Sequence, residues 1–143
     1  MNFKDRFGTA TFSLKDRDSG NTYSMKLQAN FINLMKFKKA TGTDDPMVYM
    51  LLYGAEGGIT SVVEVLHSFM IDFYDEAKPT TSLIDQMDRD NVMGWLLNAD
   101  EESNKGSGDK LKEALKVIMG EQYQKLLDQS EKKSKKKADS KAA

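Results

Sequence analysis

Two short segments near the N-terminus alternate apolar and polar residues, and they constrain the fold more than any other feature of the chain. A period of two predicts β-strands with one buried face. The residues between them, 16–21 (DRDSGN), are typical of a turn. We therefore expect a β-hairpin over about residues 8–28, and its apolar face must pack on the rest of the chain, because an isolated hairpin is barely stable. The apolar positions are Ala10, Phe12, Leu14, Tyr23, Met25 and Leu27.

The remainder of the chain has mostly helical patterning. We expect helices at about 30–41, from Asp45-Pro46 to about 53, at 59–76, in one broken or two short pieces over 81–99, and at 109–130. Residues 100–109 are polar and contain two glycines, which predicts a loop or hinge. The segment 131–143 has six lysines and no large apolar residue, so we expect a disordered basic tail.

These elements predict a single α+β domain over residues 1–130, mostly helical, followed by the tail. The hairpin would pack on a compact helical domain of about five helices. At 143 residues and 39% hydrophobic content, the chain is large enough to build one modest core. No apolar run approaches the roughly 20 residues that a membrane-spanning helix needs, and the N-terminus does not resemble a signal peptide. We therefore expect no membrane association and an intracellular location.

The residues required by common catalytic and metal sites are scarce. The chain has no cysteine, which excludes disulfides, thiolate metal sites and cysteine nucleophiles. Its one histidine, His67, would need carboxylates alone as metal co-ligands, and the acidic turn at 16–21 lacks the ligand spacing of a calcium loop. The glycine-rich segment 54–58 lacks the Lys-Ser/Thr of a phosphate-binding loop. We therefore expect neither an enzyme nor a cofactor or metal site.

Charge is unevenly distributed along the chain. Residues 1–43 carry a net charge of +5, residues 44–109 carry −11, and residues 110–143 carry +5. An acidic middle between basic ends suits head-to-tail self-association or a basic partner. A lysine-rich tail could also hold nucleic acid, but it lacks the interleaved aromatics that stack bases, and the acidic middle would repel phosphate.

Methionine and aromatic residues are abundant in the helical region. The chain has nine methionines, and flexible, polarisable methionine suits adaptable protein-binding surfaces as well as ordinary cores. We place a candidate partner-binding groove on the helices expected at 47–53 and 59–74. Its candidate residues are Met47, Tyr49, Met50, Tyr53, Met70, Tyr74 and Trp95.

The order of these parts resembles the tail assembly chaperones of long-tailed bacteriophages, especially those of Gram-positive hosts. The likeness spans about residues 8–137: an N-terminal hairpin with Phe12, Tyr23 and Leu27, a helical domain containing Asp45-Pro46, a glycine break, an acidic middle, a hinge and a lysine-rich end. The resemblance implies a non-enzymatic protein of the host cytoplasm that is absent from the mature virion. It would bind the tape measure protein, keep it soluble and help to recruit tail tube subunits.

Two other functions fit the same sequence. One is a nucleic-acid-associated accessory protein that uses the basic tail, although the acidic core argues against it. The other is a structural component of the virion, such as a head–tail connector, which purified particles would contain.

Overall fold

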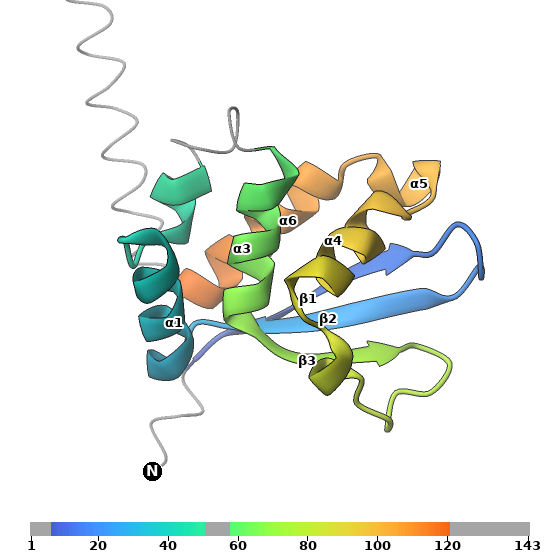
Figure 1. The fold of residues 1–143 in the computed structure, drawn as a ribbon, viewed down its shortest axis with the longest axis horizontal. Helices are drawn as coiled ribbons and strands as arrows, with labels where there is room; N and C mark the ends of the chain where they lie inside the picture. The colour runs from blue at the N-terminus through green and yellow to red at the C-terminus, as the bar shows by residue number, and fades with distance from the viewer. Residues whose placement is uncertain (1–6, 51–57, 121–143) are drawn as a thin grey trace, which may run out of the picture.

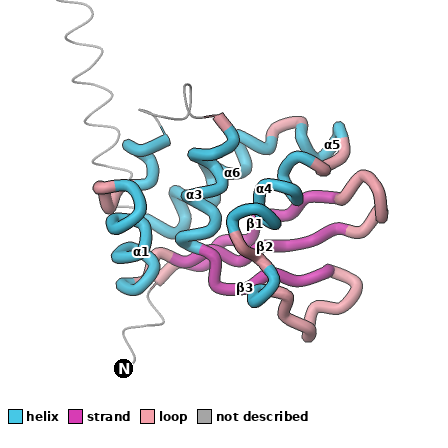
Figure 2. Tube along the Cα trace, in the orientation of Figure 1, coloured by secondary structure: helices cyan, strands magenta, loops and turns pink. Residues whose placement is uncertain are grey.

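The computed structural model describes residues 7–50 and 58–120, which form an α+β fold with a three-stranded antiparallel sheet and about five helices (Figures 1 and 2). The strands lie in the sheet in the order of the chain. In the first two strands mostly alternate residues are buried, and most of those between them are partly or fully exposed. One face of the sheet therefore packs against the helices, as the alternation in the sequence predicts.

Strands β1 (Thr9–Lys15) and β2 (Thr22–Gln28) confirm the expected hairpin. They pair antiparallel in an unbroken register in which Phe12 lies opposite Met25. In the connecting turn the amide of Gly20 donates to the Asp16 carbonyl, and Gly20 takes a positive φ of 74° that glycine adopts without strain.

The expected helix over 59–76 is wrong beyond Phe69. Helix α3 (Ile59–Phe69) ends there, and the chain continues directly as strand β3 (Met70–Asp75). The apolar residues of 69–74 fit helical spacing, but Phe73 instead pairs with Met25 and stacks on Tyr23 with 5.8 Å between ring centroids. The third strand also gives the second edge of β2 a hydrogen-bonded partner, which a helix could not provide.

Helix α1 (Phe31–Thr41) confirms the expected helix at 30–41. Its N-cap Asn30 accepts a hydrogen bond from the Asn33 amide, and Gly42 ends it in the left-handed conformation with φ 82°. Residues 46–50 are helical, and Asp45 Oδ1 caps them by accepting from the amides of Met47 and Val48 at 3.1 and 3.0 Å. Residues 51–53 of that expected helix lie outside the described residues.

Two short helices follow β3, as expected: the 3₁₀ helix η2 (Ile84–Gln86) and helix α4 (Arg89–Leu97). The expected loop at 100–109 is wrong in part, because helix α5 (Glu101–Asn104) forms there and helix α6 (Ser107–Met119) begins within it. Asp100 explains α5: its side chain accepts from the Ser103 amide as an N-cap. The helix expected to continue to residue 130 ends at Met119, where Gly120 takes a positive φ of 83°. Residues 121–130 and the tail lie outside the described residues.

The core lies between the sheet and helices α3, α4 and α6 (Figure 1). Helix α1 packs on α3, and α6 packs on β1. The largest fully buried side chains include Phe37, Phe69, Leu14, Met25 and Leu66. Within the described ranges, no helix combines the length and apolar character needed to cross a membrane.

Candidate protein-binding site

The structure does not gather on one surface the six predicted partner-binding residues that it describes. Met47, Met70 and Trp95 are each only 8% exposed and belong to the core. Trp95 packs edge-to-face against Phe12 and Phe73, with ring centroids 5.8 and 5.0 Å apart. These three residues therefore contribute to folding and offer a partner little surface.

The other predicted residues are divided between separate places. Tyr49 packs edge-to-face on buried Phe37 at 5.3 Å, and Met50 lines a cleft of about 320 Å³ beside α6. Tyr74 lies on β3 with the Lys26 ammonium 5.7 Å from its ring centroid. Tyr53 is outside the described residues. Met47 lines the same cleft as Met50.

The outer side of α1 carries an apolar surface that the sequence analysis did not single out. Phe31 and Ile32 are each 71% exposed, and Met35 is 51% exposed. Met35 lies four residues after Phe31 and three after Ile32, and residues three or four apart are neighbours on a helix, so the three form one contiguous surface. It is hollowed into a shallow depression of about 460 Å³, which three lysines also line: Lys36, Lys38 and Lys39. We call these six residues the α1 patch.

The opposite side of α1 explains why these side chains point outward. Asn33 and Phe37, one turn apart, are buried. The Asn33 Nδ2 donates to the Gln28 carbonyl at 2.9 Å and to the Phe69 carbonyl at 3.4 Å, which ties α1 to the end of β2 and of α3. Phe37 contacts Phe69 with 5.2 Å between centroids. This fixed inner face leaves the three large apolar side chains in solvent.

The spacing of apolar residues does not identify the buried face of this helix. Phe31, Leu34 and Met35 lie at helical spacing. Phe31 and Met35 are nevertheless exposed, and the structure buries a polar residue, Asn33, beside Phe37. A signal was present, because apolar residues at 31, 32, 34, 35 and 37 span more of the helix circumference than one packed face can cover. An excess of apolar residues on a short helix indicates either full burial or a second contact surface.

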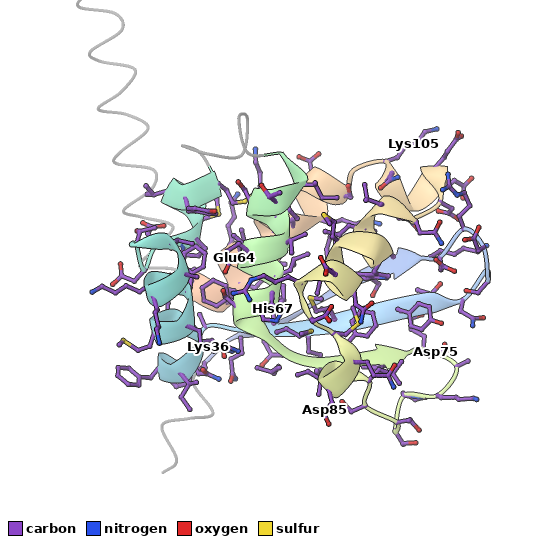
Figure 3. The ribbon with its side chains drawn as sticks, viewed as in Figure 1. Lys36, Glu64, His67, Asp75, Asp85 and Lys105 are labelled. Carbon is purple, nitrogen blue, oxygen red and sulfur yellow. The ribbon has the colours of Figure 1, made fainter. Side chains whose placement is uncertain are left out.

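Helix α1 is basic. It carries three lysines and no acidic residue. Figure 3 shows Lys36 on α1 at one side of the molecule, with Asp75 at the end of β3 and Asp85 in η2 toward the other. The α1 patch is therefore an apolar surface with a basic rim.

A polar cluster on α3 lies near the patch. Arg89 makes a bidentate salt bridge with Glu64, at 2.9 Å from Nε and 3.0 Å from Nη2, and this hydrogen bonding lowers the pKa of Glu64. His67 lies one turn further along α3 (Figure 3). Its burial, and then the positive charges of Arg89 and Lys36, lower its pKa, so the imidazole is neutral at pH 7.

The geometry of this cluster is that of a structural ion pair joining α3 to α4. His67 Nδ1 is buried and has no hydrogen-bond partner within the described part of the chain. No group of three or more His, Asp or Glu side chains among the described residues is placed to hold a metal ion.

Comparisons of the chain with known protein families, with curated proteins and with solved structures found no match. The α1 patch is thus the candidate site best supported by the geometry.

Proposed function

We propose that this chain is a non-enzymatic tail assembly chaperone of a long-tailed bacteriophage. It binds the tape measure protein through the α1 patch, keeps that protein soluble and helps to recruit tail tube subunits. The observation that carries the proposal is the exposure of Phe31, Ile32 and Met35 together on one helix. Contiguous exposed apolar residues rimmed by polar ones are typical of protein-interaction sites.

The chemistry of the patch favours an amphipathic helix as the bound element. A tape measure protein is a long helical rod, and its apolar stripe would bury Phe31, Ile32 and Met35. Fully burying a large apolar side chain contributes about 1.5–3 kcal/mol, so burial of the exposed parts of three such side chains supplies several kcal/mol. That is sufficient for a contact that holds during assembly and is released afterwards, especially when it is repeated along a rod.

The lysines add a charge preference to this apolar contact. Lys36, Lys38 and Lys39 flank the apolar residues and would lie beside acidic residues at the edge of the bound stripe. Their long side chains can also cover apolar surface while their ammonium groups stay in water. The preferred partner is therefore an amphipathic helix with acidic flanks.

The separation of charge supports a repeating arrangement along the rod. A basic surface at α1 and acidic residues such as Asp75 and Asp85 on another side of the molecule permit neighbouring copies to associate head to tail. Such contacts are weak individually and sensitive to salt. Several copies per tape measure protein would then follow from the partner's length.

Co-expression with the tape measure protein of the same phage tests the proposal. We expect a soluble complex in pull-down, and light scattering should give a mass that corresponds to several copies of this chain per tape measure protein. A tape measure protein that stays insoluble, with nothing co-purifying, would contradict the proposal.

The three lysines of α1 also favour one competing function, the binding of nucleic acid. Each lysine that neutralises a phosphate releases counterions, so this binding would weaken steeply with salt. A titration with generic DNA at two salt concentrations distinguishes the functions. Tight, salt-sensitive DNA binding that is lost when Lys36, Lys38 and Lys39 are changed to Gln would favour the nucleic-acid function over the chaperone.

A further inference from the structure

Strand β1 presents an unpaired backbone edge. It pairs with β2 on one side only, because the sheet order is β1-β2-β3. The backbone of Lys15 turns away from β2: its N–H donates to Ser103 Oγ and its carbonyl accepts from the Asp100 amide, both at 2.9 Å. In a strand, the N–H and carbonyl groups of every second residue point toward the same edge. Those of Thr11 and Ser13 therefore point toward the edge that the Lys15 backbone faces, away from β2.

One end of this edge, at Lys15 and Asp16, already has backbone partners. Asp16 and Ala99 form an isolated antiparallel bridge, next to the two bonds of Lys15. The outward backbone groups of Thr9, Thr11 and Ser13 have no hydrogen-bond partner in the part of the chain that the structure describes. The edge is therefore able to pair with another strand, and a five-residue stretch of it is open.

This open edge lacks three features that often protect an edge strand: charged residues, proline and a β-bulge. Residues 8–14 contain no charged residue and no proline, and the register with β2 has no bulge over seven pairs. The other edge strand differs: β3 carries Asp72 and Asp75, and its register with β2 is shifted between Lys26 and Leu27. The contrast indicates that the β1 edge is kept open while the β3 edge is protected.

A groove of about 600 Å³ runs along the open edge. Residues 9–13 of β1 form one side, and α6 forms the other; the α6 residues are Asp109, Lys110, Glu113, Ala114 and Val117. Gly8 closes one end by its contact with the Val117 backbone, and the segment 99–103 closes the other. The open length fits about five extended residues, or about 17 Å.

We propose that this groove binds an extended segment of a partner protein, which adds to β1 as a fourth strand. Every second side chain of the segment lies under α6 against Ala114 and half-exposed Val117, so these side chains are apolar. The others lie beside Thr9, Thr11 and Ser13 on the open face of the sheet and are small and β-branched. Main-chain hydrogen bonds between β1 and the segment provide the affinity. The alternation of apolar and small β-branched side chains along the segment provides the specificity.

The charged residues of the groove favour one sign of charge in the residues that flank the bound segment. Two carboxylates, of Asp109 and Glu113, line it against one ammonium, of Lys110. Glu113 has only a loose exposed contact with Lys116, at 3.6 Å. A basic residue next to the apolar and β-branched alternation would therefore be favoured over an acidic one.

A second copy of this chain fits the edge less well than a single extended segment. Paired strands lie about 4.8 Å apart, whereas packed helices need about 8–10 Å between their axes. Because α6 packs on β1, two copies joined through their β1 strands would bring their α6 helices too close together. This site uses β1 and α6, so its test is independent of the α1 patch.

A synthetic peptide with the sequence of residues 9–15 is a suitable probe, because it has the required alternation and a basic end. We would add it to the full ¹⁵N-labelled chain and follow amide exchange by NMR. The amides of Thr9, Thr11 and Ser13 should exchange rapidly in the free protein and at least tenfold more slowly with bound peptide. A control peptide of the same composition, ordered so that the alternation is lost, should have no effect.

Two substitutions of Thr11 distinguish strand addition at the β1 edge from peptide binding in another way. Thr11→Pro removes an outward N–H and obstructs an added strand, while the bonds between β1 and β2 remain. Thr11→Val keeps that N–H. Peptide affinity should fall at least tenfold in Thr11→Pro and stay unchanged in Thr11→Val, with the protected amides of β2 confirming that both variants are folded.

Three results would overturn the proposal. The first is unchanged exchange at all three amides in millimolar peptide. The second is equal peptide affinity of the Thr11→Pro and Thr11→Val variants. The third is a dimer in sedimentation that Thr11→Pro abolishes, which would make a second copy the occupant of the edge.

Discussion

Gly8 and Val117 bring the start of β1 and the end of α6 into direct backbone contact. A Cβ at Gly8 would lie 2.4 Å from the Val117 carbonyl oxygen, closer than a Cβ can approach, and 3.2 Å from the Val117 carbonyl carbon. The absence of a side chain at residue 8 therefore allows α6 to pack on β1. The same contact closes one end of the groove along β1.

Replacing Gly8 with alanine should destabilise the fold, because the backbone of α6 must move to make room. We expect a loss of about 1–3 kcal/mol in the free energy of unfolding, measured in urea. Gly94→Ala is the matched control: Gly94 lies inside α4 and a Cβ there meets nothing within 4 Å. That change should stabilise the protein by about 0.5–1 kcal/mol. A Gly8→Ala variant as stable as the wild type would contradict the close contact.

Trp95 joins the sheet to α4 and should be the most costly aromatic to truncate. It contacts both Phe12 and Phe73 edge-to-face. Trp95→Ala should cost about 3–5 kcal/mol. Trp95→Phe should cost far less, about 1.5 kcal/mol or below, since it keeps an aromatic ring and removes an indole N–H that is buried without a partner in the described structure. Circular dichroism during urea unfolding would measure both losses. A Trp95→Phe variant that loses as much stability as Trp95→Ala would contradict the prediction.

The Glu64–Arg89 salt bridge should contribute modestly to stability, and its contribution should depend on pH. Arg89 lowers the pKa of Glu64 in the folded state. The contribution is therefore fully present above the ordinary pKa of a glutamate and is lost as the pH falls through the lowered value. Arg89→Met should cost about 0.5–1 kcal/mol at pH 7 and less near pH 3.

A matched control for this prediction is Lys116→Met, which removes a longer and more exposed ion pair with Glu113. It should cost at most about 0.5 kcal/mol. Equal losses for the two variants at pH 7 would show that the bidentate geometry of Arg89 adds nothing.

His67 should make the fold less stable in mild acid. Burial lowers its pKa in the folded state, so the unfolded chain binds a proton more readily than the folded one. Stability should thus fall as the pH decreases below the ordinary histidine pKa, until the lowered value is reached. His67→Gln should flatten the stability profile between pH 7.5 and 5.5, as measured by urea unfolding at each pH. An unchanged slope in the variant would show that another group causes it.

The α+β class and most of the elements could be predicted from the sequence because their signals are local. Alternation over residues 9–15 and 22–28 predicts the hairpin, and capping at Asn30 and Asp45 starts two helices where expected. The third strand could not be found in this way. Residues 69–74 fit a helix on spacing alone, and only the distant partner strand, through Met25 and Tyr23, decides their conformation.

The candidate site was harder to predict for the same reason. A methionine such as Met47 or Met70 suits a core as well as an interface, and burial is decided by packing between elements distant in sequence. On α1, the hydrogen bonds of Asn33 to Gln28 and Phe69 select the buried face, and none of them is visible in the local pattern. The partner-binding role of Met50 and Tyr53 stays a prediction.

Binding of the tape measure protein by variants of the α1 patch tests the central proposal most directly. The test variant carries Phe31→Ser, Ile32→Ser and Met35→Ser; the control carries Leu97→Ser, which removes a 62% exposed apolar residue from α4. Both should fold normally, because each changed side chain is mainly in solvent. In co-expression and pull-down, we expect the control to keep the tape measure protein soluble and the triple variant to lose at least nine-tenths of it. A folded triple variant that holds the tape measure protein as well as the wild type would contradict the proposal.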